Sequence, residues 1–225
     1  PAAISDEPEP VPRKPGRRIA ILRLSTVFGL FDLGALVVGL VAVIVWAVFF
    51  RGSEPAPAAE CQPLELPSGH TIANHLQALQ GACQGFTVLS SGQTYTITAG
   101  KSLAVPAGST LLIQPGAQLS FEPGAALDVY GKLHACGTSR DQILFTSSKS
   151  LDPASTSQPK AGDWVGIRFH AGSDKESVIA HASIRFAGGG NHGAIHLEAS
   201  SPKIIDVGID NSAWFPISLD ADSQP

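Results

Sequence analysis

The sequence has few charged residues. Only 15% of its 225 residues are Asp, Glu, Lys or Arg, whereas 44% are hydrophobic. Disordered chains show the opposite balance, so we expect a folded and partly apolar protein. The 15 basic residues are outnumbered by 19 acidic ones. Because nucleic-acid-binding domains carry a basic patch or stripe, no nucleic-acid partner is expected.

Methionine is absent altogether, and the sequence begins with proline. We therefore expect this chain to be a processed or partial translation product. Glycine and proline are plentiful by contrast, with 23 and 17 residues. Both residue types interrupt regular structure, so the composition favours many turns and few long helices.

One long segment lacks charge almost completely. The residues from Leu33 to Phe50 are uncharged, and the apolar stretch extends back to Leu24 apart from Asp32. About 20 apolar residues cross a bilayer as a helix. The pattern therefore predicts a single transmembrane helix within 19–51, in contact with the lipid bilayer.

Basic residues flank this segment unequally. After it, Arg51 is followed by no Lys or Arg until Lys101, and five basic residues precede it: Arg13, Lys14, Arg17, Arg18 and Arg23. Since Lys and Arg collect on the cytoplasmic side, we expect a cytoplasmic N-terminus and an extracytoplasmic remainder, anchored in the cytoplasmic membrane. A cleaved signal peptide is the alternative, but its apolar region runs only about 7–15 residues.

Three residues within the predicted helix are candidates for packing against partner helices. Asp32 is an ionisable group in an apolar segment, and such groups often have a partner. Its position near the cytoplasmic end favours a plainer interpretation, in which the carboxylate is hydrated at the interface. Ala35 and Gly39 form a small-xxx-small pair that allows close helix approach.

The regions around the predicted helix are rich in proline. Residues 1–18 contain five prolines and mixed charges, a composition typical of disorder in isolation. We interpret 1–18 as a cytoplasmic tail and 52–67 as an extracytoplasmic linker.

A regular repeat of eight residues begins at Gly92. Apolar pairs follow each of the first five glycines at offsets of three and five, which predicts a turn and a short strand with alternate residues inward. Three such units make one coil of a three-faced parallel β-helix, predicted over 84–225. The glycines are Gly92, Gly100, Gly108, Gly116 and Gly124, and the pairs are Tyr95/Ile97, Leu103/Val105, Leu111/Ile113, Leu119/Phe121 and Leu127/Val129.

Two features refine this interpretation. A hairpin meander would use two-residue turns such as Asn-Gly, whereas the connectors at 106–108, 114–116 and 122–124 contain Pro before Gly. Proline removes a backbone donor, so strands break there. The polar stretch 147–160 interrupts the repeat and is predicted to be a loop that leaves the solenoid.

The segment before the repeats predicts a cap. Ile72, Leu76 and Leu79 lie at helical spacing, so residues 68–83 are expected to form a short amphipathic helix over the first coil. Cys61 and Cys83 bracket it outside the membrane, where disulfides persist. We expect these two cysteines to be bonded and Cys136 to be a buried free thiol.

The repeats carry a family resemblance. The run VPAGSTLLIQPGAQLSFEPGAALDVYGKLHACGTSRDQILFTS within 102–147, followed by GDWVGIRF at 162–169, resembles bacterial right-handed parallel β-helix repeat proteins of the pectin-lyase-like kind. The resemblance covers about 92–225 and implies the fold. It implies little about activity, because the family includes both surface proteins without known activity and polysaccharide lyases and hydrolases. Residues 213–225 resemble the start of another coil, so the native chain is expected to continue.

Outward positions between the inward pairs are the candidate site residues. Four of them form possible ladders on the outer faces: Arg168, Arg185, His196 and Asp206. By coil register Arg185 is expected near Asp206, which favours a cross-strand ion pair on a solvated face. Sugar hydrolysis needs paired carboxylates, and lyases combine an acidic calcium site with a base. Because the sequence offers neither plainly, we expect no catalytic residue, no metal and no cofactor.

These expectations combine into a functional hypothesis. The chain is interpreted as a non-catalytic accessory or scaffold subunit of a multisubunit membrane complex, for instance a photosynthetic or respiratory one. Its partners would be other integral membrane subunits through the helix and tail, and extracytoplasmic proteins through the β-helix. The alternatives are a membrane-anchored carbohydrate-active enzyme or glycan-binding module, and a fragment of a surface adhesin.

Overall fold

The computed structural model describes residues 61–220 and 222–225. The predicted tail at 1–18, the predicted transmembrane helix at 19–51 and most of the linker lie outside the described residues, as do Asp32, Ala35 and Gly39. Within the described part of the chain, no helix is both long enough and apolar enough to cross a bilayer.

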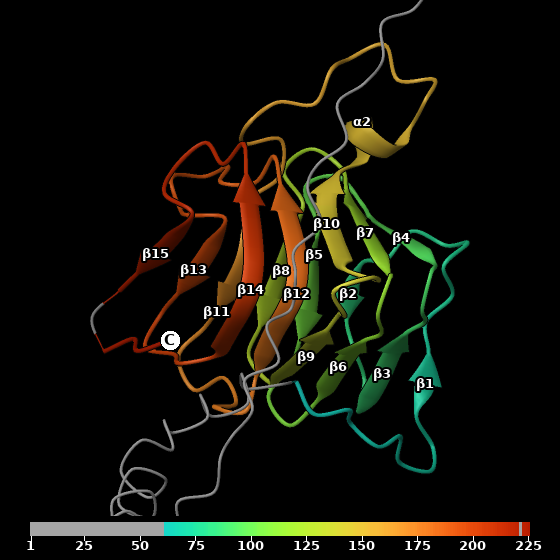
Figure 1. Ribbon diagram of the computed structural model, residues 1–225, viewed down its shortest axis with the longest axis vertical. Helices are drawn as coiled ribbons and strands as arrows, with labels where there is room; N and C mark the ends of the chain where they lie inside the picture. Colours follow the sequence, from blue (N-terminus) through green and yellow to red (C-terminus); the bar gives the residue numbers. More distant parts are fainter. Residues whose placement is uncertain (1–60, 221) are drawn as a thin grey trace, which may run out of the picture. The chain divides into compact units, whose positions relative to one another are not determined.

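The described chain forms a parallel β-solenoid of about six turns. Every strand pairing is parallel, and the strands stack along the solenoid in two sheets (Figure 1). The strands are β1 (Thr71–Ile72), β2 (Gly81–Ala82), β3 (Phe86–Leu89), β4 (Thr94–Ile97), β5 (Ser102–Val105), β6 (Thr110–Ile113), β7 (Gln118–Phe121), β8 (Ala126–Val129), β9 (Lys132–Cys136), β10 (Ile143–Ser147), β11 (Gly166–Phe169), β12 (Val178–Arg185), β13 (Ile195–Leu197), β14 (Lys203–Asp210) and β15 (Ile217–Leu219).

Each turn of the solenoid has three strand positions, as the repeat predicts. The first column contains β1, β3, β6 and β9, the second contains β4, β7 and β10, and the third contains β2, β5, β8, β11, β13 and β15. The long strand β12 joins the first two columns, because its start pairs with β9 and its end pairs with β10. The strand β14 then pairs with β12 on both sides of His181.

The register confirms a coil of about two dozen residues. Phe86 pairs with Thr110, which in turn pairs with Lys132. The predicted loop also exists: Leu127 pairs with Ile167, 40 residues later, because the chain leaves the solenoid between β10 and β11. The only regular element in this excursion is the four-residue helix α2 (Ser148–Leu151).

The predicted inward pairs form the core. All ten side chains of the first five pairs are at most 5% exposed, from Tyr95 to Val129. Later coils continue the stack, and the ring of Trp164 lies on that of Phe121 with centroids 3.9 Å apart. Parallel strands stacked in this way bury one continuous apolar column.

The glycine repeat has a conformational cause. The five glycines spaced by eight all have φ between +63° and +77°, a region where glycine avoids the steric penalty of a Cβ. Gly131 has a different requirement, because a Cβ there would collide with the backbone oxygens of Pro106 and Ser109. The eight-residue rhythm is therefore the spacing of solenoid corners.

The predicted capping helix at 68–83 is wrong. This segment contains β1 and β2 linked by turns, and its amide groups bond to the next coil, from Ala73 N to Val88 O and from Leu79 N to Thr96 O. Ile72 and Leu76 are 61% and 83% exposed, although the helix would have buried them. The helical spacing of the apolar residues does not decide the structure, since pairing of β1 with β3 satisfies backbone groups on the edge of β3, which a helix could not pair.

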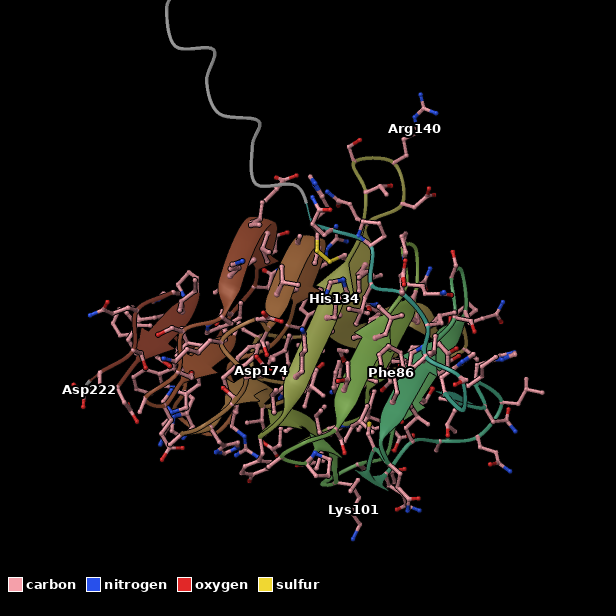
Figure 2. The ribbon with its side chains drawn as sticks, turned by 90° about the horizontal axis from the view of Figure 1, so that it is seen from below. Phe86, Lys101, His134, Arg140, Asp174 and Asp222 are labelled. Atoms are coloured by element: carbon pink, nitrogen blue, oxygen red, sulfur yellow. A yellow bond between two sulfur atoms is a disulfide. The ribbon has the colours of Figure 1, made fainter. Side chains whose placement is uncertain are left out.

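The predicted disulfide is also wrong. Cys61 is bonded to Cys136, with Cα atoms 5.8 Å apart, and the bond lies beside His134 (Figure 2). Cys83 is a free thiol that points into the core and is 7% exposed. Proximity in sequence suggested Cys83 as the partner, but its position in the first coil faces inward.

Candidate functional site

Polar side chains line the outer surface of the third column. Asp128 on β8 is in register with Arg168 on β11, which pairs with His196 on β13, which pairs with Ser218 on β15. Each lies between two inward-facing residues, because side chains alternate across a strand. We call these four residues the outer ladder.

The strongest contact of the outer ladder joins Asp128 and Arg168. Arg168 donates from Nε to Asp128 Oδ1 at 2.6 Å and from its Nη2 to Oδ2 at 2.8 Å. The Asp128 side chain is 9% exposed and that of Arg168 is 29% exposed. A guanidinium that grips both carboxylate oxygens fixes both side chains.

A second row of side chains is formed by the residue that comes directly after the end of each of these strands. Each of its four residues comes two positions after the outer-ladder residue of its coil, and we call them the corner row: Tyr130, His170, Glu198 and Asp220. His170 connects the two rows, with Nε2 3.1 Å from Asp128 Oδ1 and Nδ1 3.1 Å from Glu198 Oε2. The ring of Tyr130 stacks on that of His170, with centroids 4.2 Å apart.

The environment of Asp128 favours its charged form. Burial raises the pKa of this carboxyl, but hydrogen bonds from Arg168, Ser102 and His170 outweigh it, and the pKa lies below its ordinary value. Asp128 is therefore an anion at neutral pH.

His196 holds the far end of the outer ladder. Its Nδ1 is 2.9 Å from Ser218 Oγ, and its ring lies 4.4 Å from that of His192. Burial and then the neighbouring His192 lower the pKa of His196. The ring is consequently neutral at neutral pH, even though Asp220 Oδ2 lies 3.7 Å from Nε2.

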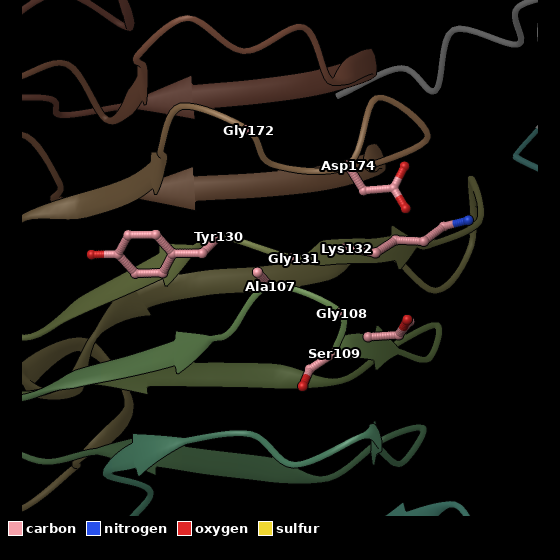
Figure 3. Close-up of a pocket in the computed structure, with 9 residues that line it drawn as sticks. Ala107, Gly108, Ser109, Tyr130, Gly131, Lys132, Gly172 and Asp174 are labelled. Atoms are coloured by element: carbon pink, nitrogen blue, oxygen red, sulfur yellow. The ribbon is translucent and has the colours of Figure 1, made fainter.

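A cavity opens at the corner beside Tyr130. It has a volume of about 310 Å³ and lies between the ends of the third-column strands and the starts of β6 and β9. Figure 3 shows Tyr130 on one side and Lys132 and Asp174 on the other. Lys132 also donates to Glu176 Oε2 at 2.7 Å. The aromatic ring and the polar groups thus border the same hollow.

The four sequence candidates fall into two groups. Arg168 and His196 are neighbours in the outer ladder, whereas Arg185 and Asp206 lie on β12 and β14 of the other sheet. The expected stacking of Arg185 near Asp206 is wrong.

The reason is that the coil from β12 to β14 is four residues longer than expected. Asp210, not Asp206, is in register with Arg185, and its Oδ2 lies 3.9 Å from Arg185 Nε. Asp206 accepts instead from His181 Nδ1 at 2.7 Å. His181 and Asp206 both have positive φ, 47° and 49°, which bends the two strands at the same place and keeps these residues out of the ladder.

Sequence reasoning missed Asp128 and most of the corner row. Asp128 stands between the predicted inward residues Leu127 and Val129, so its outward position was available from the alternation. Its pairing with Arg168 was hidden by the loop, which separates them by 40 residues. The corner row was visible as the residue after each inward pair of the third column.

Residues able to hold a metal lie elsewhere. In the part of the chain that the structure describes, the one group of three ligand-type side chains within chelating reach is Cys61, His134 and Cys136. It belongs to the first column, and the outer ladder does not contribute to it.

Comparison with known proteins adds no relative. No family model matches the chain, and the searches of curated proteins and of solved structures found no match to it. The resemblance to β-helix repeat proteins rests on the repeat pattern and on the solenoid.

Proposed function

We propose that this chain is a non-catalytic binding module that holds a partner on the outer ladder and the corner row. The observation that carries the proposal is the two-pronged contact of Arg168 with Asp128. This contact occupies the carboxylate of Asp128 with a hydrogen-bonded partner, and it orders both side chains.

The state of the acids argues against sugar hydrolysis. A general acid needs a raised pKa, and a second carboxylate must face it across the substrate. The pKa of Asp128 is lowered, and Glu198 is connected to it only through the ring of His170. These groups suit recognition better than proton transfer.

The same features favour binding. The residue Tyr130 is 43% exposed, and the side chains of Glu198 and Asp220 are 49% and 56% exposed. Beneath them, Asp128 and Arg168 are fixed by hydrogen bonds. A surface whose polar groups are already ordered loses little conformational entropy when a partner binds. The solenoid therefore supplies a stiff platform with accessible groups along one side.

The handedness of the solenoid, its family and its membrane anchor are inferred from the sequence. The sequence favours a right-handed, pectin-lyase-like β-helix carried by a membrane helix at 19–51, with partners in a multisubunit membrane complex. Under this hypothesis the solenoid contacts an extracytoplasmic protein while 19–51 contacts integral membrane subunits.

A glycan is the second candidate partner. The half-exposed ring of Tyr130 borders a cavity with Lys132 and Asp174, and sugars pack on aromatic faces while polar groups bind their hydroxyls. The ring keeps one face stacked on His170. The opposite face is therefore the surface on which a sugar would pack.

Affinity capture tests the proposal. The tagged full chain is extracted from membranes in mild detergent, and partners that co-purify in stoichiometric amounts are measured. Tyr130→Ala should remove the extracytoplasmic partner, because it deletes the exposed ring, while partners held by 19–51 should remain. Arg185→Gln on the other sheet is the matched control and should retain the extracytoplasmic partner. Equal recovery with both variants would contradict the assignment of this face.

Polysaccharides separate the two partner classes. Saturable binding of the wild-type chain to an acidic or neutral polysaccharide, lost in Tyr130→Ala, would identify the glycan alternative. Release of new chain ends from any of these polymers would refute the non-catalytic proposal.

A further inference from the structure

A second cluster of reactive side chains lies on the outer side of the first column. The ligand atoms of Cys61, His134 and Cys136 all lie within 4.8 Å of one another. The two cysteines are the partners of the disulfide. His134 takes no part in that bond, and its presence needs a separate explanation.

The backbone places two of these side chains side by side. His134 and Cys136 are two residues apart on β9, so both project to the same face of the strand. His134 Nε2 lies 3.1 Å from Cys136 Sγ. Cys61 reaches them from the segment that precedes the solenoid, and in that segment the backbone of Gln62 accepts a hydrogen bond from the ring of His134.

The donor set is one that zinc prefers. Two thiolates and one imidazole leave a tetrahedral ion one open position for water or another ligand. Two thiolates also neutralise the charge of a divalent ion, which lowers the cost of holding it beside the 6% exposed His134. A metal-ligating histidine usually donates its other ring N–H to a fixed acceptor, and the backbone of Gln62 is such an acceptor for His134.

There is room beside the cluster for a fourth ligand. Two cavities of about 330 Å³ each are lined by both Cys61 and His134. One extends toward Leu112 and Gln114, and the other toward Lys203 and Ile205. A water molecule can reach the open position from either side.

We propose that this cluster binds a zinc ion when the bond between Cys61 and Cys136 is reduced. In the oxidised chain the disulfide then joins Cys61 to strand β9, and in the reduced chain the zinc ion joins them. A dithiol reductant supplies two electrons and two protons to the sulfur atoms and itself becomes a disulfide, and zinc then displaces both protons from the resulting thiols. The proposal is independent of the binding face described above.

Cobalt titration of the reduced full chain tests the site. A water-soluble phosphine opens the disulfide and becomes the phosphine oxide, with water supplying the oxygen atom and the two thiol protons. One equivalent of Co²⁺ should then bind with intense thiolate-to-cobalt absorption, and Zn²⁺ should displace it. The oxidised chain should show less than about a tenth of this absorption, because its sulfur atoms cannot act as thiolates.

Three variants assign the ligands. His134→Ala keeps both cysteines, so its fold can be checked in the disulfide-bonded form, and it should weaken cobalt binding more than about tenfold. Cys136→Ser should abolish the thiolate absorption. Cys83→Ser is the control and should bind as the wild type does, because burial raises the pKa of the Cys83 thiol to about 11 and keeps it protonated.

Three results would overturn the proposal. The first is failure of the reduced wild-type chain to bind one equivalent of Co²⁺. The second is equal affinity in the wild type and in His134→Ala. The third is loss of the absorption in Cys83→Ser, which would place the metal at a different thiol.

Discussion

Asp128 shows how a single residue organises the candidate binding face. It accepts hydrogen bonds from Arg168 and His170 while its side chain is only 9% exposed. Hydrogen bonds to a charged group contribute more to stability than neutral ones. The residue is thus a structural anchor of the face, with Tyr130 and Glu198 as the accessible contacts around it.

Replacing Asp128 tests this role. Asp128→Asn should lower the free energy of unfolding at pH 7 by about 2 kcal/mol, because Arg168 loses its charged partner. A carboxyl whose pKa is lowered by folding, as that of Asp128 is, stabilises the protein above its unfolded pKa and ceases to do so as pH falls through the folded value. The difference between wild type and variant should therefore shrink below about pH 4. Urea unfolding at several pH values measures it.

The control for this experiment is Asp141→Asn. Asp141 is exposed, and a surface substitution of this kind changes stability by about 0.5 kcal/mol or less. An Asp128 variant that behaved like the control, at neutral pH and below, would contradict the anchoring role.

At this scale the sequence predicted half of the outer ladder. Arg168 and His196 were found because they stand between strongly apolar neighbours in a regular strand. Asp128 occupies the same kind of position, but its partner Arg168 comes after the loop between β10 and β11. The two can be paired from the sequence only if the loop residues are left out of the coil length. The error with Arg185 and Asp206 has another origin, because Ile205 and Ile209 are both apolar and Ile184 pairs with Ile209.

At the scale of single elements, the corners and the loop determine how the coils stack. Gly131 lies where β8 ends and β9 begins, and its Cα faces the backbone oxygens of Pro106 and Ser109 in the coil beside it. The amide of Gly131 bonds to Val105 O at 2.9 Å. Two coils approach each other here more closely than any side chain allows.

Gly131→Ala should therefore destabilise the protein by about 3 kcal/mol or more, since backbone atoms of two coils would have to separate. Gly208→Ala is the matched control, because a Cβ at Gly208 has nothing within 4 Å and its φ is not positive. Thermal unfolding of both variants measures the difference. Equal unfolding temperatures would show that the coils are not in close contact at Gly131.

The loop between β10 and β11 is tied to the solenoid by Asp163. This side chain is 2% exposed and accepts from Ser147 Oγ at 2.8 Å and from Lys149 Nζ at 2.7 Å. Burial raises the pKa of Asp163, but its donors, Lys149 first among them, bring the pKa below the ordinary value. A charged anchor therefore closes the loop at neutral pH.

Asp163→Ala should release this loop and cost about 3 kcal/mol, because the variant leaves Lys149 without its anion. Trypsin should then cleave after Lys149 and Lys160 faster than in the wild type. Asp152→Ala is the control, since the side chain of Asp152 accepts only from Ala154 N, in the exposed part of the loop. Cleavage at the same rate in both variants would contradict the anchor.

Elements were predicted well where the repeat is regular and poorly where it starts. The strands from β4 to β8 follow the glycine spacing, because each corner needs a positive φ. The segment 68–83 has no such spacing, and its three apolar residues at helical intervals predicted a helix. In the structure β1, within this segment, pairs with β3 instead. Strand pairing with a later coil is a tertiary interaction that local periodicity does not report.

For the whole molecule, the architecture follows from stacking, and the function follows from one outer surface. Parallel coils bury an apolar column and leave the third column with rows of polar residues in register. The fold was predictable because it repeats. The candidate binding face was only partly predictable, because its contacts join different coils, and the disulfide depended on a segment outside the repeat.

Site-specific photo-crosslinking tests the central claim most directly. A photoreactive phenylalanine analogue is introduced at Tyr130 in the full chain, or at Leu76, an 83% exposed position outside the binding face. The account predicts one discrete adduct with a partner from position 130 and none from position 76. Identical adducts from both positions, or no adduct with protein or glycan from position 130, would contradict it.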